Sequence, residues 1–239
     1  MKTKNFLLIV LVLQSMLWLA GCDSPLKVGE LQTESYTVEL GNTTAVRVEI
    51  VMGAGDLDVS GGSEDLLEAD FTYNVERFKP EVQYMDETLL VQQPNIEGAS
   101  DWREFVNYRN SWNLSLNDEV PMDLHMDIGG GGGNLQLAEL SLTALDIDFG
   151  AGEFTIDLDE NWTNDLRVII NAGAADVRLR LPTDVGVRVE VEEGARLVQF
   201  TGLTKDENAY INAAYGVSDV TLQIEMTVGF GQIYLEAGN

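Results

Sequence analysis

The stretch that decides the fold is Leu145-Asp146-Ile147-Asp148-Phe149-Gly150-Ala151-Gly152-Glu153-Phe154-Thr155-Ile156. Apolar and acidic residues alternate up to Phe149, and the alternation resumes at Phe154. Because successive side chains of a strand point to opposite sides, this pattern predicts strands with one buried and one solvated side. The glycines between them supply the positive φ angles that a sharp reversal requires. The stretch therefore predicts two short strands joined by a tight glycine turn.

The same unit recurs along the chain. From Gly131 to Gly150, Gly173 and Gly194 the steps are 19, 23 and 21 residues, a period typical of solenoids and stacked β arrays. One unit cannot bury its apolar side alone, so neighbouring units must stack. The sequence therefore predicts an all-β protein whose short strands stack in a β-solenoid-like array. Further copies, some of them looser, occupy 48–59, 129–137, 168–179, 187–197 and 224–235.

Residues 31–121 are less repetitive than residues 122–239. Alternating segments in the first part predict strands of a meander, with Pro80 and Pro94 at their edges. Residues 95–110 are polar and predict a surface loop. We therefore expect a meander-like N-terminal β region over 31–121 and a Gly-turn repeat region over 122–239.

The N-terminus has the order of a secretory signal. Lys2 and Lys4 precede a mostly apolar run that is too short for a spanning helix. Leu19-Ala20-Gly21-Cys22 resembles the bacterial lipobox. That resemblance implies cleavage before Cys22, a diacylglycerol on its sulfur and an acylated amino terminus. Residues 1–21 would then be the signal peptide and 22–30 a lipidated tether. The alternative is an ordinary secretory signal followed by a chance cysteine.

Lipid and charge together predict where the protein works. Two or three acyl chains on Cys22 hold a protein on a bilayer, here the outer side of the cytoplasmic membrane, or an outer membrane where the cell has one. The 239 residues carry a formal net charge of −26, which repels nucleic acid and anionic head groups. Cys22 is the only cysteine, so no intramolecular disulfide can form.

A series of motifs resembles the toast-rack family, in order, over nearly all of the chain after Cys22. They are Gly53-Ala54-Gly55-Asp56-Leu57, Tyr73-Asn74, Pro80-Glu81-Val82, Leu90-Val91-Gln92-Gln93, Arg109-Asn110-Ser111-Trp112-Asn113, Val120-Pro121-Met122-Asp123-Leu124, Gly131-Gly132-Gly133-Asn134-Leu135 and Phe149-Gly150-Ala151-Gly152. The chain departs from the family at Gly132, where Ala is commoner, and at Ala175, where Gly is usual.

The resemblance implies a right-handed, β-helix-like stack of short strands. Relatives include portions of LiaF-like envelope-stress regulators and of phage-shock-type membrane proteins, which act by contact with other envelope proteins. Their membrane helices have no counterpart in this sequence, and the lipid on Cys22 is expected to replace them. That departure weighs against direct signalling into the cytoplasm.

The sequence predicts neither an enzyme nor a cofactor. His125 is the only histidine, and it alternates with Leu124 and Met126, so it is expected as an exposed strand residue. No Gly-x-Ser-x-Gly elbow is present, and the five glycines at 129–133 lack the Lys-Ser/Thr of a phosphate loop. A hydrolase would require a pocket that brings His125 together with two carboxylates.

Pairs of acidic residues two apart predict a solvated face that blocks edge pairing between sheets. The alternative is a stacked acidic stripe that attracts Ca²⁺. Neither an EF-hand loop nor the glycine-rich Ca²⁺ nonapeptide is present in the sequence. The pairs and triplets are Asp56/Asp58, Asp146/Asp148, Asp157/Asp159/Glu160 and Glu190/Glu192/Glu193.

Aromatic and basic residues gather in and after the polar loop. Exposed aromatics beside arginine are typical anchors of protein interfaces, and the candidate contact residues are Trp102, Arg103, Phe105, Tyr108 and Arg109. Trp112 is expected in the core instead. The leading prediction is a lipid-anchored, non-catalytic scaffold that contacts envelope proteins or wall polymers, with a role in envelope-stress sensing. The alternative is a surface adhesin or polysaccharide-binding solenoid.

Overall fold

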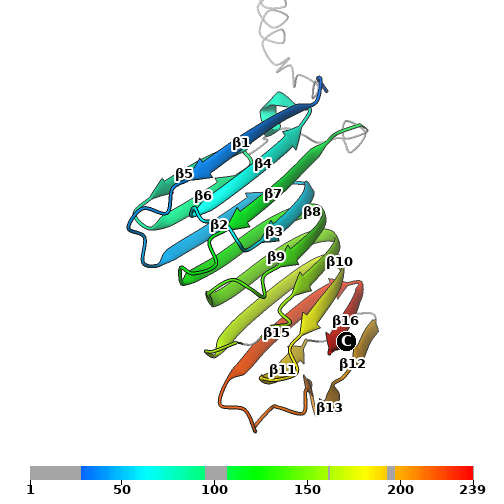
Figure 1. Cartoon of the computed structure of the whole chain (residues 1–239). Coiled ribbons are helices and arrows are strands. Elements are labelled where there is room, and N and C mark those ends of the chain that lie inside the picture. The colour runs from blue at the N-terminus through cyan, green and yellow to red at the C-terminus, as the bar shows by residue number, and fades with distance from the viewer. Residues whose placement is uncertain (1–27, 95–106, 161, 193–196, 239) are drawn as a thin grey trace, which may run out of the picture.

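The computed structural model describes residues 28–94, 107–160, 162–192 and 197–238, and these are almost entirely β-structure (Figure 1). Within these ranges, no helix combines the length and apolar character needed to cross a membrane. The elements are β1 (Gln32–Val38), β2 (Val46–Met52), β3 (Gly55–Ser60), β4 (Leu67–Tyr73), the short 3₁₀ helix η1 (Glu76–Phe78), β5 (Glu81–Met85), β6 (Thr88–Gln92), β7 (Asn110–Leu116), β8 (Met122–Gln136), β9 (Leu142–Asp157), β10 (Leu166–Leu181), β11 (Gly186–Val191), β12 (Leu197–Thr201), β13 (Thr204–Asp206), β14 (Ala209–Ile211), β15 (Thr221–Phe230) and β16 (Gln232–Ala237).

The repeating unit is a bent rung, and the rungs stack in parallel. β8 pairs with β2 through residues 122–128 and with β3 through residues 131–135. β10 likewise pairs with β15 through its first half and with β16 through its second half. Each rung therefore contributes its first half to one face, called face A, and its second half to the other, called face B. The predicted all-β array of stacked strands is confirmed.

The glycine turn differs from the predicted break between two strands. In β8, β9 and β10 the strand continues through the bend, whereas β2/β3 and β15/β16 are interrupted there. Gly131 and Gly152 have φ of 130° and 141° and pair with each other across the ladder. A Cβ on Gly152 would overlap the Gly131 carbonyl oxygen. Glycine is needed because the bends stack backbone on backbone.

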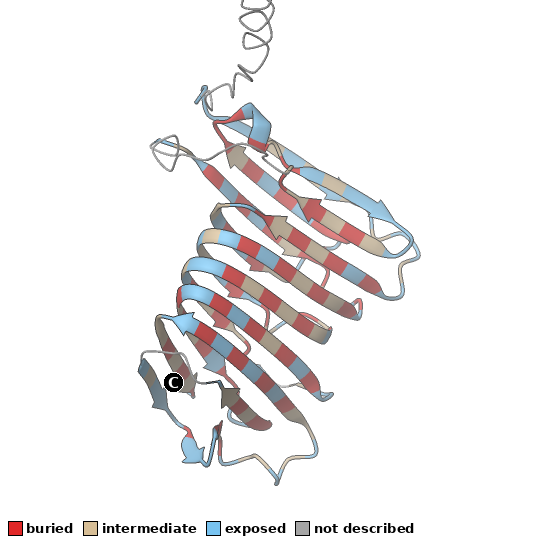
Figure 2. Ribbon diagram, turned by 180° about the vertical axis from the view of Figure 1, so that it is seen from behind, coloured by how far each residue is buried: buried red, intermediate tan, exposed pale blue. Residues whose placement is uncertain are grey.

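Parallel, in-register pairing places equivalent residues of successive rungs in columns. One core column of face A contains Val48, Leu124, Leu145, Val168, Ile224 and Val189, all buried. Figure 2 shows the resulting alternation of buried and outward-facing residues along the strands of the central rungs. The alternation predicted for Leu145 to Ile156 is confirmed, because the apolar members are buried and the acidic members face outward.

The order of the rungs in space departs from their order in sequence at both ends. β6 and β7 form a rung that lies outside β2/β3, and β15/β16 lies between β10 and β11/β12. Antiparallel strands complete the ends: β5 and the pair β4–β1 at one end, and the hairpin β13–β14 at the other. Edge strands of this kind limit stacking of further rungs. The regions before and after Pro121 meet where β2 and β3 pair with β8.

Candidate functional site

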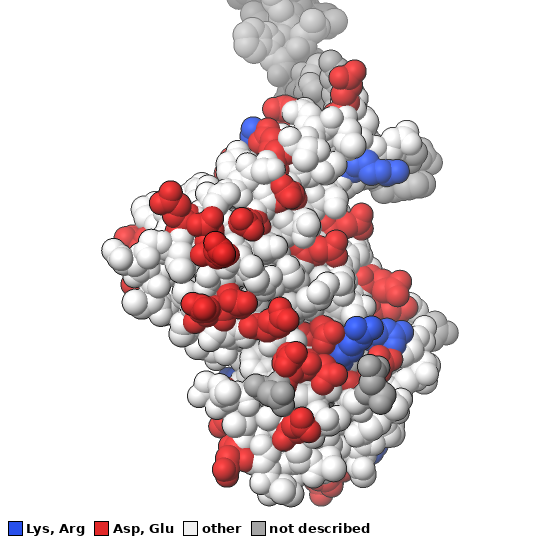
Figure 3. All heavy atoms as spheres, viewed as in Figure 1, with Lys and Arg blue, Asp and Glu red and all other residues white. Residues whose placement is uncertain are grey.

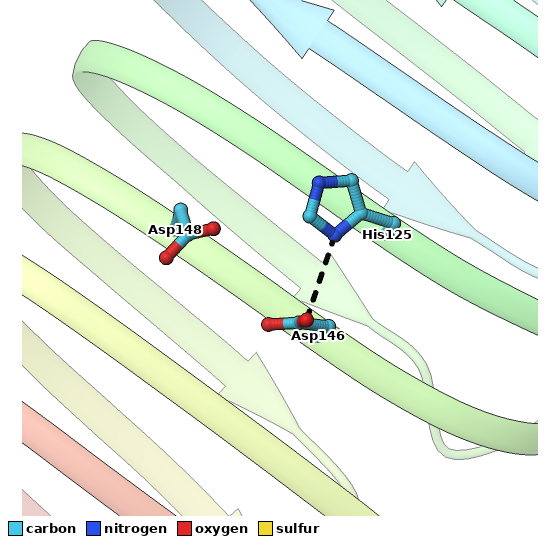
Figure 4. Close-up of side chains that lie close together, drawn as sticks. All are labelled: His125, Asp146 and Asp148. Carbon is cyan, nitrogen blue, oxygen red and sulfur yellow. Dashed lines mark ion pairs between the residues drawn. The ribbon is translucent and has the colours of Figure 1, made fainter.

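His125, Asp146 and Asp148 meet on the outward side of face A (Figure 4). His125 comes from β8 and faces Asp146 in the register of the ladder with β9, and Asp148 follows two residues later on the same side of β9. The alternation that buries Leu124, Leu145 and their neighbours turns all three polar side chains outward. The parallel stack thereby brings together residues about twenty positions apart.

The three side chains offer ligand atoms that lie within 4.8 Å of one another. His125 Nδ1 is 3.8 Å from Asp146 Oδ2, which is too long for a hydrogen bond. Asp146 Oδ1 is buried and has no hydrogen-bond partner. Asp148 Oδ1 accepts a hydrogen bond of 3.0 Å from Asn171 Nδ2 on β10. One imidazole and two carboxylates are thus held together, with one oxygen unsatisfied.

His125 was expected as an exposed strand residue, and the structure refines this expectation. Its side chain faces outward but is 30% exposed, because Asp146 lies beside it. The two carboxylates that a hydrolase would require are present, yet the cluster lies on the outward side of a sheet. Two clefts in the described part of the chain are lined by other residues, one beside Pro80 and one beside Pro121. Alignment of Gly131 with Gly152, instead of with Gly150, carries the missed signal, since it places His125 opposite Asp146.

Only part of the predicted partner-contact set falls within the described residues. Trp102, Arg103 and Phe105 lie outside them, so their contact role stays a prediction. The Tyr108 hydroxyl donates to the Ala54 carbonyl, and its ring packs edge-on against Phe78 at 4.8 Å. Burial raises the pKa of this phenol. The Arg109 side chain is exposed, while its backbone N–H donates to Asn74 Oδ1 at 2.8 Å.

A polar network that sequence reasoning missed surrounds the turn Gly53-Ala54-Gly55. Gln93 Oε1 accepts hydrogen bonds from Gly53 N at 3.1 Å and from Asn110 Nδ2 at 3.2 Å. Asn110 Nδ2 also donates to the Ala54 carbonyl at 2.8 Å, and its Oδ1 accepts from Trp112 Nε1 at 2.8 Å. Gln93 and Asn110 are both buried. The network fixes both ends of the segment that joins β6 to β7.

Trp112 lies in the core, as the sequence predicts. It is buried, and its ring packs edge-on against Phe71 at 5.4 Å. Its indole N–H is satisfied by Asn110, which allows a large ring with one polar atom to be buried without loss of a hydrogen bond. Of the described aromatic residues in this cluster, Trp112 lies in the core and Tyr108 is half-buried.

The outer faces carry the chain's acidity. Figure 3 shows acidic side chains over much of the visible face and few basic ones. Arginines of the faces lie beside carboxylates, as Arg47 does with Glu49 at 2.8 Å and Arg167 with Glu225 at 3.2 Å. Burial, with repulsion from Asp157 and Glu160, raises the pKa of Asp159. The Ca²⁺ alternative for these acidic columns stays a prediction.

The chain matches a family model and several solved structures. The model for the N-terminal domain of toast_rack (DUF2154) matches residues 27–180. A candidate cell adhesion protein from Clostridium sporogenes superposes with a TM-score of 0.81 at 26% identity, over 87% of this chain and 100% of that one. A candidate adhesin from Bacteroides fragilis matches at a TM-score of 0.26 and 11% identity, over 88% of this chain and 98% of that one. No curated protein matches the chain. Since the family model covers more than half of the sequence, the chain belongs to the toast-rack family.

Proposed function

We propose that this protein is a lipid-anchored scaffold of the bacterial cell envelope, which binds other envelope proteins without catalysing a reaction. The lipid on Cys22 attaches it to the membrane, and the segment that contains Trp102, Arg103 and Phe105 contacts the partner. The toast-rack fold supports an extracytoplasmic scaffold, and the lipobox-like sequence supports the anchor.

The position of the first described residues supports the anchoring geometry. Gly29 N donates to the Asn74 carbonyl at 2.7 Å, and β1 is the last strand at its end of the stack. A tether at Cys22 would therefore hold the stack by the end formed by β1, β4 and β5. The end formed by β11 to β14 would then lie furthest along the stack from the anchor (Figure 1).

The polar network supports a contact role for the segment between β6 and β7. In β8 and β9 the two faces are joined by a bend a few residues long, whereas residues 93–109 join them in the β6/β7 rung. Gln93 accepts a hydrogen bond from Gly53 N, and Asn110 and Tyr108 donate to the Ala54 carbonyl, so the ends of this insertion are held against the neighbouring turn. Long connections on a rigid scaffold commonly carry binding residues.

Adhesion is a second candidate function, and one observation favours it. The similarity to the Clostridium sporogenes protein extends over the whole of that protein and 87% of this chain. Adhesion would place the partner on another cell or on a wall polymer, instead of within the same envelope.

Replacement of Cys22 tests the anchor. We expect Cys22→Ser to abolish incorporation of a labelled fatty acid and to move the protein from the membrane fraction to the soluble fraction. Persistence of the label, or of membrane association, would overturn the lipid anchor.

Crosslinking in intact cells tests the scaffold. We expect Trp102→Ala to reduce capture of envelope proteins at unchanged melting temperature. Tyr84→Ala, which removes an exposed aromatic side chain from β5, should leave capture unchanged. Equal capture by both variants would contradict the contact role. Binding of purified protein to whole cells, with no captured envelope protein, would favour adhesion.

A further inference from the structure

We propose that His125, Asp146 and Asp148 form a binding site for one divalent transition-metal ion of the Zn²⁺ class on face A. The site does not depend on the proposed scaffold function, because it rests on three side chains of the folded stack. It differs from the Ca²⁺ stripe considered for the acidic columns, since an imidazole is one of the three ligands.

The donor atoms fit such an ion in number and position. Each residue contributes one ligand atom, and these atoms lie within 4.8 Å of one another. Small rotations of the side chains would bring them to the roughly 2.0–2.2 Å ligand distances that Zn²⁺ adopts with imidazole and carboxylate. Three protein ligands leave a fourth position open toward solvent, for water or for a group from another molecule.

An unsatisfied oxygen provides an independent observation. The Asp146 side chain is 44% exposed as a whole, but its Oδ1 atom is buried without a hydrogen-bond partner, and a buried acceptor in that state costs free energy. The other oxygen of the same carboxylate is 3.8 Å from His125 Nδ1, with no hydrogen bond between them. A cation shared by the imidazole and the carboxylate compensates both groups at once.

The surroundings hold the ligands in place. Asn171 Nδ2 donates to Asp148 Oδ1 at 3.0 Å, the kind of outer contact that orients a ligating carboxylate. β8 and β9 pair in register from Asp123 to Gln136, and the residues that flank the three ligands along both strands are buried. The ligands therefore project from rigid strands and not from loops.

Neighbouring charges favour a cation at this position. Glu49 of β2 lies opposite His125 in the ladder and pairs with Arg47 at 2.8 Å. Asp127 of β8 lies opposite Asp148 and is exposed. At least one further carboxylate therefore lies within one rung of the three ligands. The net negative charge of the chain also makes its electrostatic potential negative.

The donor set favours Zn²⁺ over Ca²⁺ and Mg²⁺. Ca²⁺ takes six to eight oxygen ligands, and Mg²⁺ requires octahedral oxygen coordination. Imidazole suits Zn²⁺ and its neighbours in the transition series. We therefore expect millimolar Ca²⁺ to leave the bound ion in place.

The single histidine makes the test direct. The full chain, purified in detergent without a histidine tag, would be labelled with ¹³C at histidine, so that every imidazole signal comes from His125. Titration with Zn²⁺ should shift these signals and saturate at one ion per chain by equilibrium dialysis. Unshifted signals at saturating Zn²⁺ would overturn the site.

Three variants separate this site from the general acidity of the surface. His125→Gln removes the imidazole ligand and should weaken Zn²⁺ binding at least about tenfold, and Asp146→Asn should do the same. Asp58→Asn removes one charge from an acidic pair on face B that has no histidine beside it, and should leave binding within about twofold. Equal affinity of His125→Gln and the wild type would overturn the proposal, as would displacement by equimolar Ca²⁺.

Discussion

The central rungs and the β6/β7 rung connect the two faces in opposite ways. β8 and β9 bend through stacked glycines, so that one backbone lies directly on the next. The β6/β7 rung replaces the bend with residues 93–109, whose ends are held by buried amide side chains. The first arrangement needs the absence of a side chain, and the second needs particular side chains. In the β6/β7 rung, side-chain hydrogen bonds to the backbone of the Gly53–Gly55 turn take the place of the backbone contacts that stacked glycines make elsewhere.

The largest expected effect comes from adding a side chain to a central bend. Gly152 has φ of 141°, and a Cβ there would meet the carbonyl oxygen of Gly131. We expect Gly152→Ala to lower the free energy of unfolding by about 5 kcal/mol or to prevent folding. Denaturant unfolding measures this, and Gly216→Ala is the matched control, since Gly216 also has positive φ but has open space around it. Similar losses from both variants would contradict stacking as the cause.

Removal of the largest core ring of the β6/β7 rung should have the next largest effect. Trp112 is buried against Phe71, and truncation of such a ring leaves a cavity. We expect Trp112→Ala to reduce the free energy of unfolding by about 3–5 kcal/mol. The measurement is again denaturant unfolding. A loss below about 1 kcal/mol would contradict a core role for Trp112.

A smaller effect is expected from the amide that fixes the insertion. Asn110→Ala removes hydrogen bonds to the Ala54 carbonyl and Gln93 and leaves the buried Trp112 N–H without its acceptor. We expect a loss of about 1–3 kcal/mol. Amide hydrogen exchange should accelerate at Arg109, next to the removed group. Asn113→Ala, an exposed change on the same strand, should do neither, and an equal loss there would refute the network's role.

The regular part of the molecule follows from the sequence because its physics is local. Alternation fixes which side of a strand is buried, and the spacing of the glycines fixes the length of a rung, so the repeat of Leu145 to Ile156 predicted the central stack. The order of the end rungs could not be predicted, because β6 and β11 have alternations similar to those of their neighbours. Nothing local determines that β6 lies outside β2.

The candidate site was likewise predictable only in its local part. Asp146 and Asp148 were predicted on one side of one strand, and His125 on the outward side of another. Their meeting depends on the register between two rungs, which alternation alone leaves open to a shift of two residues. The network of Gln93, Asn110 and Tyr108 gave no periodic signal, since it joins residues that are distant in sequence through single hydrogen bonds.

The smallest expected effect concerns the end of the stack formed by β1, β4 and β5, called the end cap. There, polar side-chain contacts at the edge of the sheet take the place of stacking on a further rung. Lys79 Nζ lies 2.7 Å from Glu34 Oε1, and the Tyr73 hydroxyl donates to the same oxygen at 2.9 Å. The contact with Lys79, followed by that with Tyr73, lowers the pKa of Glu34 below its ordinary value of 4.5. The carboxylate therefore stabilises the folded state above about pH 4.5, and this contribution is lost as the pH falls through the lower folded-state pKa.

We expect Glu34→Gln to lower the melting temperature by about 1–2 °C at pH 7 and by less at pH 3. Arg167→Gln breaks the more exposed pair with Glu225 on the central stack and should shift the melting temperature less at pH 7. A larger effect at Arg167 would mean that the central faces, and not the cap, depend on surface charge.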